Sequence, residues 1–332
     1  MAYLELRGIC KSYVRNARAP SQANGKLPVL RDVNLNIDEN EFVCVVGRSG
    51  SGKTTLISLI AGLIEPDLGE ILLEGKPIDG PSPDRGVVFQ NYSLLPWMTV
   101  FENVYLAVDA VGPNLAKAEK RERTERYIRL VNLSAAMKKV PRELSGGMRQ
   151  RVAVARGLAM DPKVLLLDEP FSALDALTRG TLQEELGRIW MATRKTVLMV
   201  THDVDEALLL ADRIVLMTNG PAATVGEIVT VPFQRPRDRL AIIADPVYAE
   251  TRGQLIDFLE ERAHHQAAAT PPAPEKKTAD ARCAATPDEH FCHRKIHGFQ
   301  PLSPPLSRGA DSLRILRPEE RRGGRKSGTH GA

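Results

Sequence analysis

The sequence has few aromatic residues and no long apolar run. Only 5% of its 332 residues are aromatic, and no stretch approaches the roughly 18 uninterrupted apolar residues that a membrane-spanning helix needs. Its first residues also lack the basic and then apolar pattern of a secretory signal. We therefore expect a chain that neither spans a membrane nor is exported by this route. Apolar residues still make up 43% of the chain, which is enough for a sizeable core.

Cysteine is also scarce. Two of the four cysteines, Cys10 and Cys44, lie in the apolar body, and Cys283 and Cys292 lie in the C-terminal tail. This distribution is not a disulfide framework, and it fits a reducing compartment. The spacing of the tail cysteines and of the histidines near them matches no zinc site, so we expect no zinc there.

Positive charge is concentrated near the C-terminal end. Residues 263–332 contain 12 Lys or Arg and 7 Asp or Glu, whereas the whole chain has a formal net charge of only +4. The body, residues 1–262, is therefore close to neutral, and we expect no nucleic-acid binding by it. From residue 266 onward the tail is rich in Pro, Arg, Gly and Ser, a composition that predicts disorder.

A glycine-rich segment stands between two apolar runs early in the chain. Residues 47–54 read G-x-x-x-x-G-K-[ST], after the strand-like run 42–46 and before the helix-compatible run 56–63. A buried strand, a glycine turn and a helix start direct several backbone N–H groups at one point, where a polyphosphate would sit. Lys53 would reach the β and γ phosphates, and the Thr54 hydroxyl would complete a Mg²⁺ shell. The predicted ligands are a nucleotide triphosphate and Mg²⁺.

Polar side chains follow three further strand-like runs. Asp168 and Glu169 end one such run, Gln90 follows a second, and His202 follows a third. Because α/β sheets bind ligands beyond the C-terminal ends of their strands, we expect these side chains near the phosphate loop. A lone histidine is more often a packing or surface residue than a catalytic one. The position of His202 at a strand end favours the catalytic reading.

The middle of the chain changes character. Residues 113–140 are dense in Lys, Arg and Glu, which predicts a helical lobe with a charged, solvated outer face. After this lobe, Ser145 stands where a helix N-cap would, and Gly146 and Gly147 follow it. A second exposed helix N-terminus is thus offered to an anion.

With these pieces in this order, residues 3–262 resemble the ATP-binding subunits of ABC transporters. The specific element is Leu144-Ser-Gly-Gly-Met-Arg-Gln150, which looks like that family's signature motif; other phosphate-loop proteins lack it. The resemblance implies an α/β fold of the P-loop NTPase, ABC ATPase type. Its core sheet would be joined by an N-terminal antiparallel β subdomain and by a helical subdomain at about residues 92–160. Residues 1–262 would form the ATPase domain, and residues 263–332 a disordered tail.

The resemblance also implies a head-to-tail dimer that buries two ATP molecules. Each would lie between the phosphate loop of one copy and the signature helix of the other. Glu169 would polarise the attacking water, His202 would hydrogen-bond the γ-phosphate and orient Glu169, and Gln90 would link the site to the membrane partner. The implied catalytic residues are Lys53, Gln90, Glu169 and His202, and the implied Mg²⁺ ligands are Thr54, Gln90 and Asp168. The implied nucleotide contacts are Tyr13, Gly47, Arg48, Ser49, Gly50, Ser51, Gly52, Lys53, Thr54, Thr55, Ser145, Gly146, Gly147 and Asp175.

Tyr13 is interpreted differently with and without the resemblance. By itself it reads more readily as a strand-edge aromatic than as a flat surface for a purine base. It matches, however, the position of the family's adenine-stacking aromatic, and the resemblance therefore favours the second interpretation.

The segment after Gln90 is where such subunits receive a short cytoplasmic helix of a membrane-spanning partner. Residues 91–97, Asn-Tyr-Ser-Leu-Leu-Pro-Trp, would line that groove with apolar and aromatic side chains. The resemblance thus implies permease subunits as partners and an indirect link to a periplasmic or lipoprotein solute-binding protein. It implies a peripheral location at the cytoplasmic face of the inner membrane, and it leaves open whether the two ATPase copies are identical.

A finer resemblance concerns the transported anion. Residues 88–97, 176–180, 201–210 and 218–223 look like those of nitrate, nitrite and cyanate importers, which are close relatives of the taurine and sulfonate importers. We predict an energy-coupling ATPase for nitrate or nitrite, or for cyanate, with taurine or aliphatic sulfonates as the alternative cargo. Some nitrate-type subunits carry a large C-terminal substrate-sensing domain. The tail here is too short and too polar for one, so we expect no regulation by nitrate within this chain.

Two alternatives come from other functional classes. One is a soluble ABC ATPase that acts on DNA or ribosomes, but no long coiled-coil insertion and no second ATPase half is present in the sequence. The other is a scaffold that binds ATP without hydrolysing it. The presence of Glu169, His202 and the signature segment argues against that alternative.

Overall fold

The computed structural model describes residues 2–14 and 26–269, with side chains described as far as residue 260. The predicted disorder of the tail and the tail's cysteines and histidines lie outside the described residues, apart from the first few residues of that tail. Within the described part, no helix is long and apolar enough to cross a membrane.

The centre of the fold is a six-stranded sheet with the order β10-β9-β3-β8-β7-β6. Its strands are β3 (Phe42–Val46), β6 (Arg85–Val88), β7 (Val164–Asp168), β8 (Thr196–Thr201), β9 (Arg213–Met217) and β10 (Val225–Thr230). All neighbouring strands are parallel except β10, which is antiparallel to β9. Near-continuous apolar sequence in β3 and β7 is what a strand buried on both faces requires. The predicted strands therefore form one sheet whose C-terminal strand ends meet at one edge.

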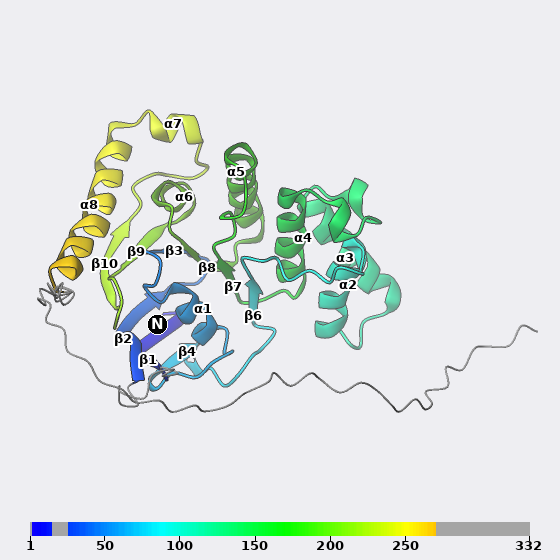
Figure 1. Ribbon diagram of the computed structural model, residues 1–332. Helices are drawn as coiled ribbons and strands as arrows, with labels where there is room; N and C mark the ends of the chain where they lie inside the picture. The colour runs from blue at the N-terminus through cyan, green and yellow to red at the C-terminus, as the bar shows by residue number, and fades with distance from the viewer. Residues whose placement is uncertain (1, 15–25, 270–332) are drawn as a thin grey trace, which may run out of the picture. The chain divides into compact units, whose positions relative to one another are not determined.

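Side chains alternate across this sheet and build two cores. In β3, Phe42, Cys44 and Val46 belong to one buried cluster, while Val43 and Val45 belong to the other. The second cluster also contains the buried face of α1 (Lys53–Ile60) and residues of a smaller sheet, so α1 lies between the two sheets (Figure 1). Because successive side chains of β3 point to opposite faces of the sheet, β3 packs into both cores. The phosphate loop, which joins β3 to α1, therefore follows a strand that is fixed on both faces.

The smaller sheet is antiparallel and has the order β2-β1-β4-β5. Its strands are β1 (Leu4–Val14), β2 (Lys26–Ile37), β4 (Leu68–Leu73) and β5 (Lys76–Pro77). Together with the six-stranded sheet and the helical lobe described next, it confirms the predicted α/β fold with an N-terminal antiparallel sheet.

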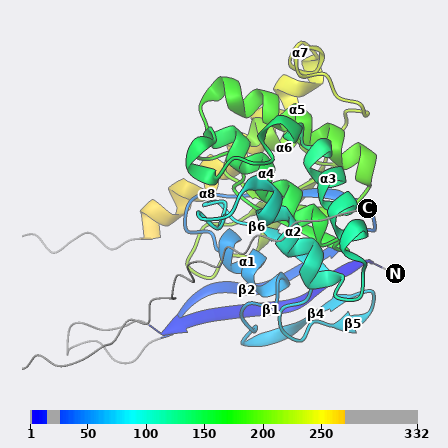
Figure 2. The same cartoon turned by 90° about the vertical axis from the view of Figure 1, so that its right-hand side faces the viewer.

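The helical lobe follows β6 and contains α2 (Val100–Val111), α3 (Lys117–Leu130) and α4 (Gly146–Ala159), with single turns of 3-10 helix at Ser134–Ala136 and Pro141–Glu143. Figure 2 views the same chain turned by 90°. A capping box begins α2, because Thr99 and Glu102 hydrogen-bond to each other's backbone N–H. Helix α3 buries only Lys120, Thr124, Tyr127 and Ile128. Its charged face is therefore largely solvated, as predicted.

The remaining helices pack into the buried cluster on the face of the central sheet opposite α1. They are α5 (Ala176–Thr193), α6 (Val204–Leu210), α7 (Arg239–Ile243) and α8 (Pro246–Ala269). Two of them differ from what the sequence predicts, namely a turn at residues 233–240 and an amphipathic helix at residues 247–263. The turn expected at 233–240 ends in the short helix α7, begun by a hydrogen bond from the Ala241 N–H to the Asp238 side chain. The helix expected at 247–263 runs on to Ala269, so it includes the first residues of the tail that we expected to be disordered. The exact domain boundaries remain predictions.

Candidate nucleotide and catalytic site

The phosphate loop leaves its helix start open to a ligand. Gly50 and Gly52 have φ angles of 87° and 82°, a left-handed conformation that glycine adopts without strain. Helix α1 begins at Lys53 without a hydrogen bond from any capping side chain, so its first-turn N–H groups remain for an anion. The Ser51 hydroxyl is buried and has no hydrogen-bond partner among the described residues. A phosphate oxygen fits both observations, since it would accept from the backbone and from this hydroxyl.

Lys53 is buried beside the loop that it follows. Its Nζ donates to the carbonyl oxygens of Gly47 at 2.8 Å and of Arg48 at 3.1 Å, and it lies 3.9 Å from Glu169 Oε1. Burial lowers the pKa of Lys53, against the opposing effect of the Glu169 and Asp168 carboxylates. The ammonium is thus held over the loop, where the negative charge of a polyphosphate would stabilise its charged form.

Thr54 and Asp168 form an oxygen pair at the end of β7. The Thr54 hydroxyl donates to Asp168 Oδ1 at 3.3 Å, although 114 residues separate the two in sequence. Burial raises the pKa of Asp168, the Thr54 hydrogen bond lowers it, and the neighbouring Glu169 raises it. The Asp168 and Glu169 carboxylates together carry more negative charge than the Lys53 ammonium balances, so this place favours binding of a further cation. Hydroxyl and carboxylate oxygens at this separation suit neighbouring ligands of Mg²⁺.

Glu169 and His202 face each other beyond the ends of β7 and β8. His202 Nδ1 lies 3.4 Å from Glu169 Oε2, and the His202 side chain is 57% exposed. Glu169 has a φ of 44°, which is unusual for a residue with a Cβ and is a form of strain found at functional sites. Its carboxylate therefore lies between a cation on one side and an imidazole on the other, with access for water.

Gln90 joins this group through a residue for which the sequence suggested no role. Gln90 Nε2 donates to Ser172 Oγ at 3.0 Å, and Ser172 Oγ donates to the Glu169 carbonyl oxygen at 3.0 Å. The Ser172 hydroxyl thus links the loop after β6 to the backbone that follows β7. Its place in Ser172-Ala-Leu-Asp175, a segment whose spacing from the other motifs resembles that of ABC ATPases, was the only sequence signal for it.

A cavity of about 520 Å³ adjoins the phosphate loop. Arg48, Ser49 and Gly50 line it together with Leu27, and Leu27 is the cross-strand partner of Tyr13 in the smaller sheet. The Tyr13 side chain is 43% exposed. The strand pairing therefore brings the expected base-stacking residue towards the same side of the fold as the loop. Thr55 follows Thr54 on α1 and is half-buried.

The signature residues form a separate group. Ser145 caps α4 by accepting a hydrogen bond from the Met148 N–H at 3.3 Å, and a Cβ on Gly147 would lie 2.7 Å from Thr178 Cγ2 on α5. Asp175 caps the same α5 by accepting from the Thr178 N–H at 3.0 Å. Among residues 2–14 and 26–260, no hydrogen bond or ion pair joins Ser145, Gly146, Gly147 or Asp175 to the phosphate loop. One copy thus brings together the loop and the acids at the end of β7, but not the signature.

Comparisons with known proteins show which proteins this chain resembles. The family model described as ABC transporter matches residues 30–172. The bicarbonate transport ATP-binding protein CmpD of Synechococcus elongatus is 56% identical over 241 residues, which are 73% of this chain and 87% of that protein. The nitrate import ATP-binding protein NrtD of the same organism is 54% identical over 241 residues, which are 73% of this chain and 88% of that protein.

A solved structure gives the same result for the fold. A dimeric ATP-binding cassette in a post-hydrolysis state, bound to ADP and phosphate, has a TM-score of 0.59 and 31% identity to this chain. The likeness covers 70% of this chain and all of that one. Phosphate loop, acidic strand end, strand-end histidine and signature helix occur together in a chain with relatives of this similarity, and the chain therefore belongs to the ABC transporter family as an ATP-binding subunit.

Proposed function

We propose that this chain hydrolyses ATP to drive import of nitrate or nitrite through a bacterial membrane. The observation that carries the proposal is the cluster of Lys53, Thr54, Asp168, Glu169 and His202 at one edge of the central sheet. The similarity to a nitrate import subunit supports the cargo and favours it over taurine and sulfonates. An ATPase subunit does not contact the anion, so the cargo rests on likeness and not on a pocket.

Bicarbonate is a second candidate cargo, which our sequence interpretation did not include. It enters because a relative named for bicarbonate transport and one named for nitrate import are similar to this chain to nearly the same degree, at 56% and 54% identity. Both ions are planar oxyanions with one negative charge. Transporters for the two can therefore differ mainly in subunits that bind the anion, while their ATPases stay alike.

In the proposed reaction, the loop N–H groups, Ser51 and Lys53 bind the phosphates and hold the γ-phosphoryl group in line with water. Glu169 accepts a hydrogen bond from that water and polarises it for attack. His202 keeps the Glu169 carboxylate oriented. Thr54 and Asp168 would hold Mg²⁺ with Gln90 nearby, and the bound ion would neutralise charge on the phosphoryl oxygens.

The separation of the signature from the phosphate loop supports a dimer. Ser145 and Gly147 would contact the γ-phosphate of the partner copy, with Asp175 near the seam. The proposed membrane partner would insert a cytoplasmic helix into the groove at residues 91–97, where Trp97 is 72% exposed. We place the chain at the cytoplasmic face of the inner membrane, bound to permease subunits and indirectly served by a solute-binding protein.

Arg156 supports the proposed docking groove from the signature helix. Its guanidinium donates to the carbonyl oxygens of Ser93 at 2.6 Å and Tyr92 at 3.0 Å. Both residues have positive φ angles, 63° for Tyr92 and 48° for Ser93, which costs free energy in residues with a Cβ. One half-buried cation thus holds two strained residues in the groove, and it connects them to the helix that Ser145 begins.

We expect Arg156→Leu to lower the free energy of unfolding by about 2 kcal/mol, because two carbonyl groups lose a charged donor. Adding Ser93→Gly should recover about 1 kcal/mol, because glycine adopts the left-handed conformation without strain. Ser93→Ala is the matched control, since it removes the same hydroxyl but keeps the Cβ. Urea unfolding measures all four chains. Equal effects of Ser93→Gly and Ser93→Ala would show that backbone strain at this position is not what Arg156 holds.

Uptake of labelled nitrate tests the function itself. Cells lacking this gene are complemented with wild type or with Glu169→Gln, and bicarbonate, cyanate and taurine uptake are measured in parallel. Nitrate uptake restored by wild type alone supports the proposal. Restoration of another anion alone would change the cargo, and no effect on any of the four would overturn the transport role.

A further inference from the structure

A buried carboxylate that the mechanism above does not use accepts a hydrogen bond from the residue that precedes His202. Glu206, on α6, is 4% exposed. It accepts a hydrogen bond from Thr201 Oγ1 at 2.6 Å and another from Gln183 Nε2 at 3.0 Å. Thr201 and Gln183 are each 2% exposed. Burying a carboxylate this deeply costs free energy, which its hydrogen bonds must offset.

On one side, this network closes the turn that carries His202. The Thr201 hydroxyl, which donates to Glu206, accepts a hydrogen bond from the Asp203 N–H at 3.0 Å. This bond closes a turn around His202, because it links the side chain of the residue before His202 to the backbone of the residue after it. The Asp203 carboxylate is also 3.5 Å from the guanidinium of Arg179 on α5. The direction in which His202 projects towards Glu169 thus depends on this turn.

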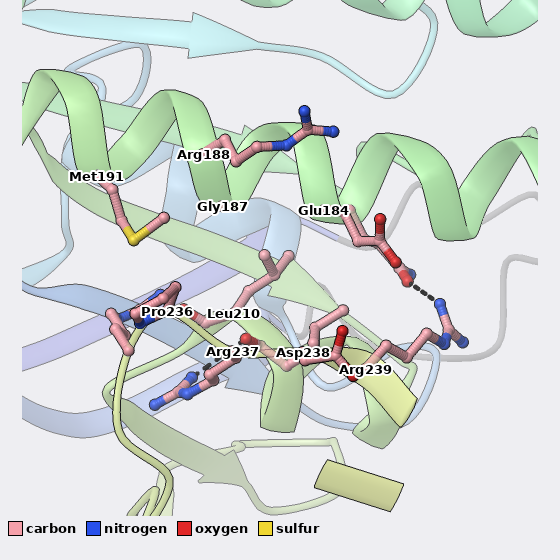
Figure 3. A pocket seen from close by; sticks show the side chains of 12 residues that line it. Glu184, Gly187, Arg188, Met191, Leu210, Pro236, Arg237, Asp238 and Arg239 are labelled. Carbon is pink, nitrogen blue, oxygen red and sulfur yellow. Dashed lines mark hydrogen bonds between the residues drawn. The ribbon is translucent and has the colours of Figure 1, made fainter. Parts of the chain in front are cut away.

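On the other side, the network reaches the strap formed by residues 233–239. Gln183 Oε1 accepts a hydrogen bond from Arg239 Nη1 at 2.8 Å. Both residues line a cavity of about 300 Å³ between α5 and the strap, and Figure 3 labels Arg239 in this cavity. In the same strap, Arg237 donates to carbonyl oxygens at the end of α6, among them Ala211 at 2.6 Å and Leu209 at 3.2 Å. The strap is therefore anchored independently of Arg239.

The chemistry allows only one orientation of the Gln183 amide. Its carbonyl oxygen faces the Arg239 cation, and its NH₂ group faces the Glu206 carboxylate. A flipped amide would set NH₂ against guanidinium and oxygen against carboxylate. Arg239 thus selects the amide orientation that supplies Glu206 with a donor, and Glu206 in turn holds the Thr201 hydroxyl.

We propose that Glu206 and Gln183 are positioning residues for ATP hydrolysis, which hold the turn at residues 201–203 so that His202 faces Glu169, with Arg239 fixing the amide. The proposal rests on the functions proposed above for Glu169 and His202. It makes the strap after β10 a support of the catalytic site, although residues 233–239 do not line the cavity beside the phosphate loop.

The first test is Glu206→Gln, which keeps the size of the side chain. If the oxygen of the new amide accepts from Thr201, its NH₂ group meets the Gln183 NH₂ group, and a flip of Gln183 to avoid this would meet Arg239. If the new amide turns so that its oxygen accepts from Gln183, its NH₂ group faces Thr201 and the Thr201 hydroxyl loses its acceptor. None of these arrangements satisfies every donor. We expect kcat for ATP hydrolysis to fall about 10- to 100-fold because the catalytic turn shifts, while KM for ATP changes less than about twofold because the phosphate loop is untouched.

The second test exchanges the two side chains, as Gln183→Glu with Glu206→Gln. The new carboxylate at position 183 would accept from Arg239 and from the new amide at position 206. The oxygen of that amide would accept from Thr201, so every donor is satisfied again. We expect kcat to recover to within about threefold of wild type. Adding Arg239→Met to the exchanged chain should remove the recovery, because the carboxylate at position 183 would then lie without its cation.

Three further measurements make the outcome decisive. Glu184→Gln makes the same chemical change at an exposed position on α5 and should keep wild-type kcat. Thermal unfolding checks that each variant folds. His202→Ala should lose activity; if it does not, the function proposed for His202 fails. If His202→Ala is inactive while Glu206→Gln keeps wild-type kcat, or while the exchange recovers nothing in a folded chain, the inference about Glu206 and Gln183 is wrong.

Discussion

Glu169→Gln is expected to hydrolyse ATP at least about 100-fold more slowly than wild type while it still binds ATP. The Glu169 carboxylate lies 3.9 Å from Lys53 Nζ and 3.4 Å from His202 Nδ1, a position from which it can accept a hydrogen bond from an attacking water. A glutamine has the same size but is a weaker acceptor and cannot take a proton. The groups proposed to bind phosphate, the loop N–H groups and Lys53, are unchanged by the substitution.

Because hydrolysis would no longer separate the copies, the Glu169→Gln chain should accumulate as an ATP-bound dimer. Phosphate release measures the rate, and light scattering with and without ATP measures the dimer. Glu184→Gln, which changes an exposed carboxylate, serves as the control for the charge change. A Glu169→Gln chain that stays monomeric with ATP would contradict the proposed two-copy site, and one that keeps wild-type turnover would contradict the proposed function of Glu169.

The second large effect is expected from Ser145→Arg. Ser145 caps α4 through its hydrogen bond with the Met148 N–H, away from the phosphate loop of its own copy. We therefore expect ATP affinity of the isolated chain to change less than about threefold, while hydrolysis falls at least about 100-fold because the arginine blocks the γ-phosphate of the partner. Loss of the cap alone should cost only about 1 kcal/mol of stability.

Lys53→Met provides the contrast, since it removes a proposed phosphate contact within the same copy and should weaken ATP binding itself. Ser134→Arg places the same side chain at an exposed position of the helical lobe and should leave both properties unchanged. Fluorescent nucleotide titration and phosphate release separate binding from turnover. If Ser145→Arg weakened binding by the monomer as much as Lys53→Met, the signature would act within one copy, and the proposed dimer site would be wrong.

Several parts of the site were predictable because their signals are local. A glycine turn between a buried strand and a helix has a recognisable order of residue types, and the structure has α1 at Lys53–Ile60, overlapping the helix-compatible run at 56–63. The acids after β7 and the histidine after β8 follow directly from apolar runs that end at those residues. The helix start at Ser145 was likewise visible, since Ser at an N-cap satisfies backbone N–H groups through its own side chain.

Other parts of the fold and the site could not be predicted, because no local sequence pattern indicates them. The Gln90 amide reaches Glu169 only through Ser172, and a lone serine in a turn gives no sign of such a link. The short helix α7 was missed because its five residues are too few to show a helical period. Its first residue, Arg239, joins the buried amide of Gln183, 56 residues earlier in the chain.

The sequence by itself determined the set of chemical groups and the element that carries each of them. The reason is that backbone conformation, capping and burial depend mainly on residues that are neighbours in the chain. What only the tertiary structure decided is which groups meet. The strand order places β8 between β3 and β7, and this order sets the Thr54 hydroxyl against Asp168 and the His202 imidazole against Glu169. Strand order results from how whole faces pack into two cores, and those contacts join residues that are far apart in the chain.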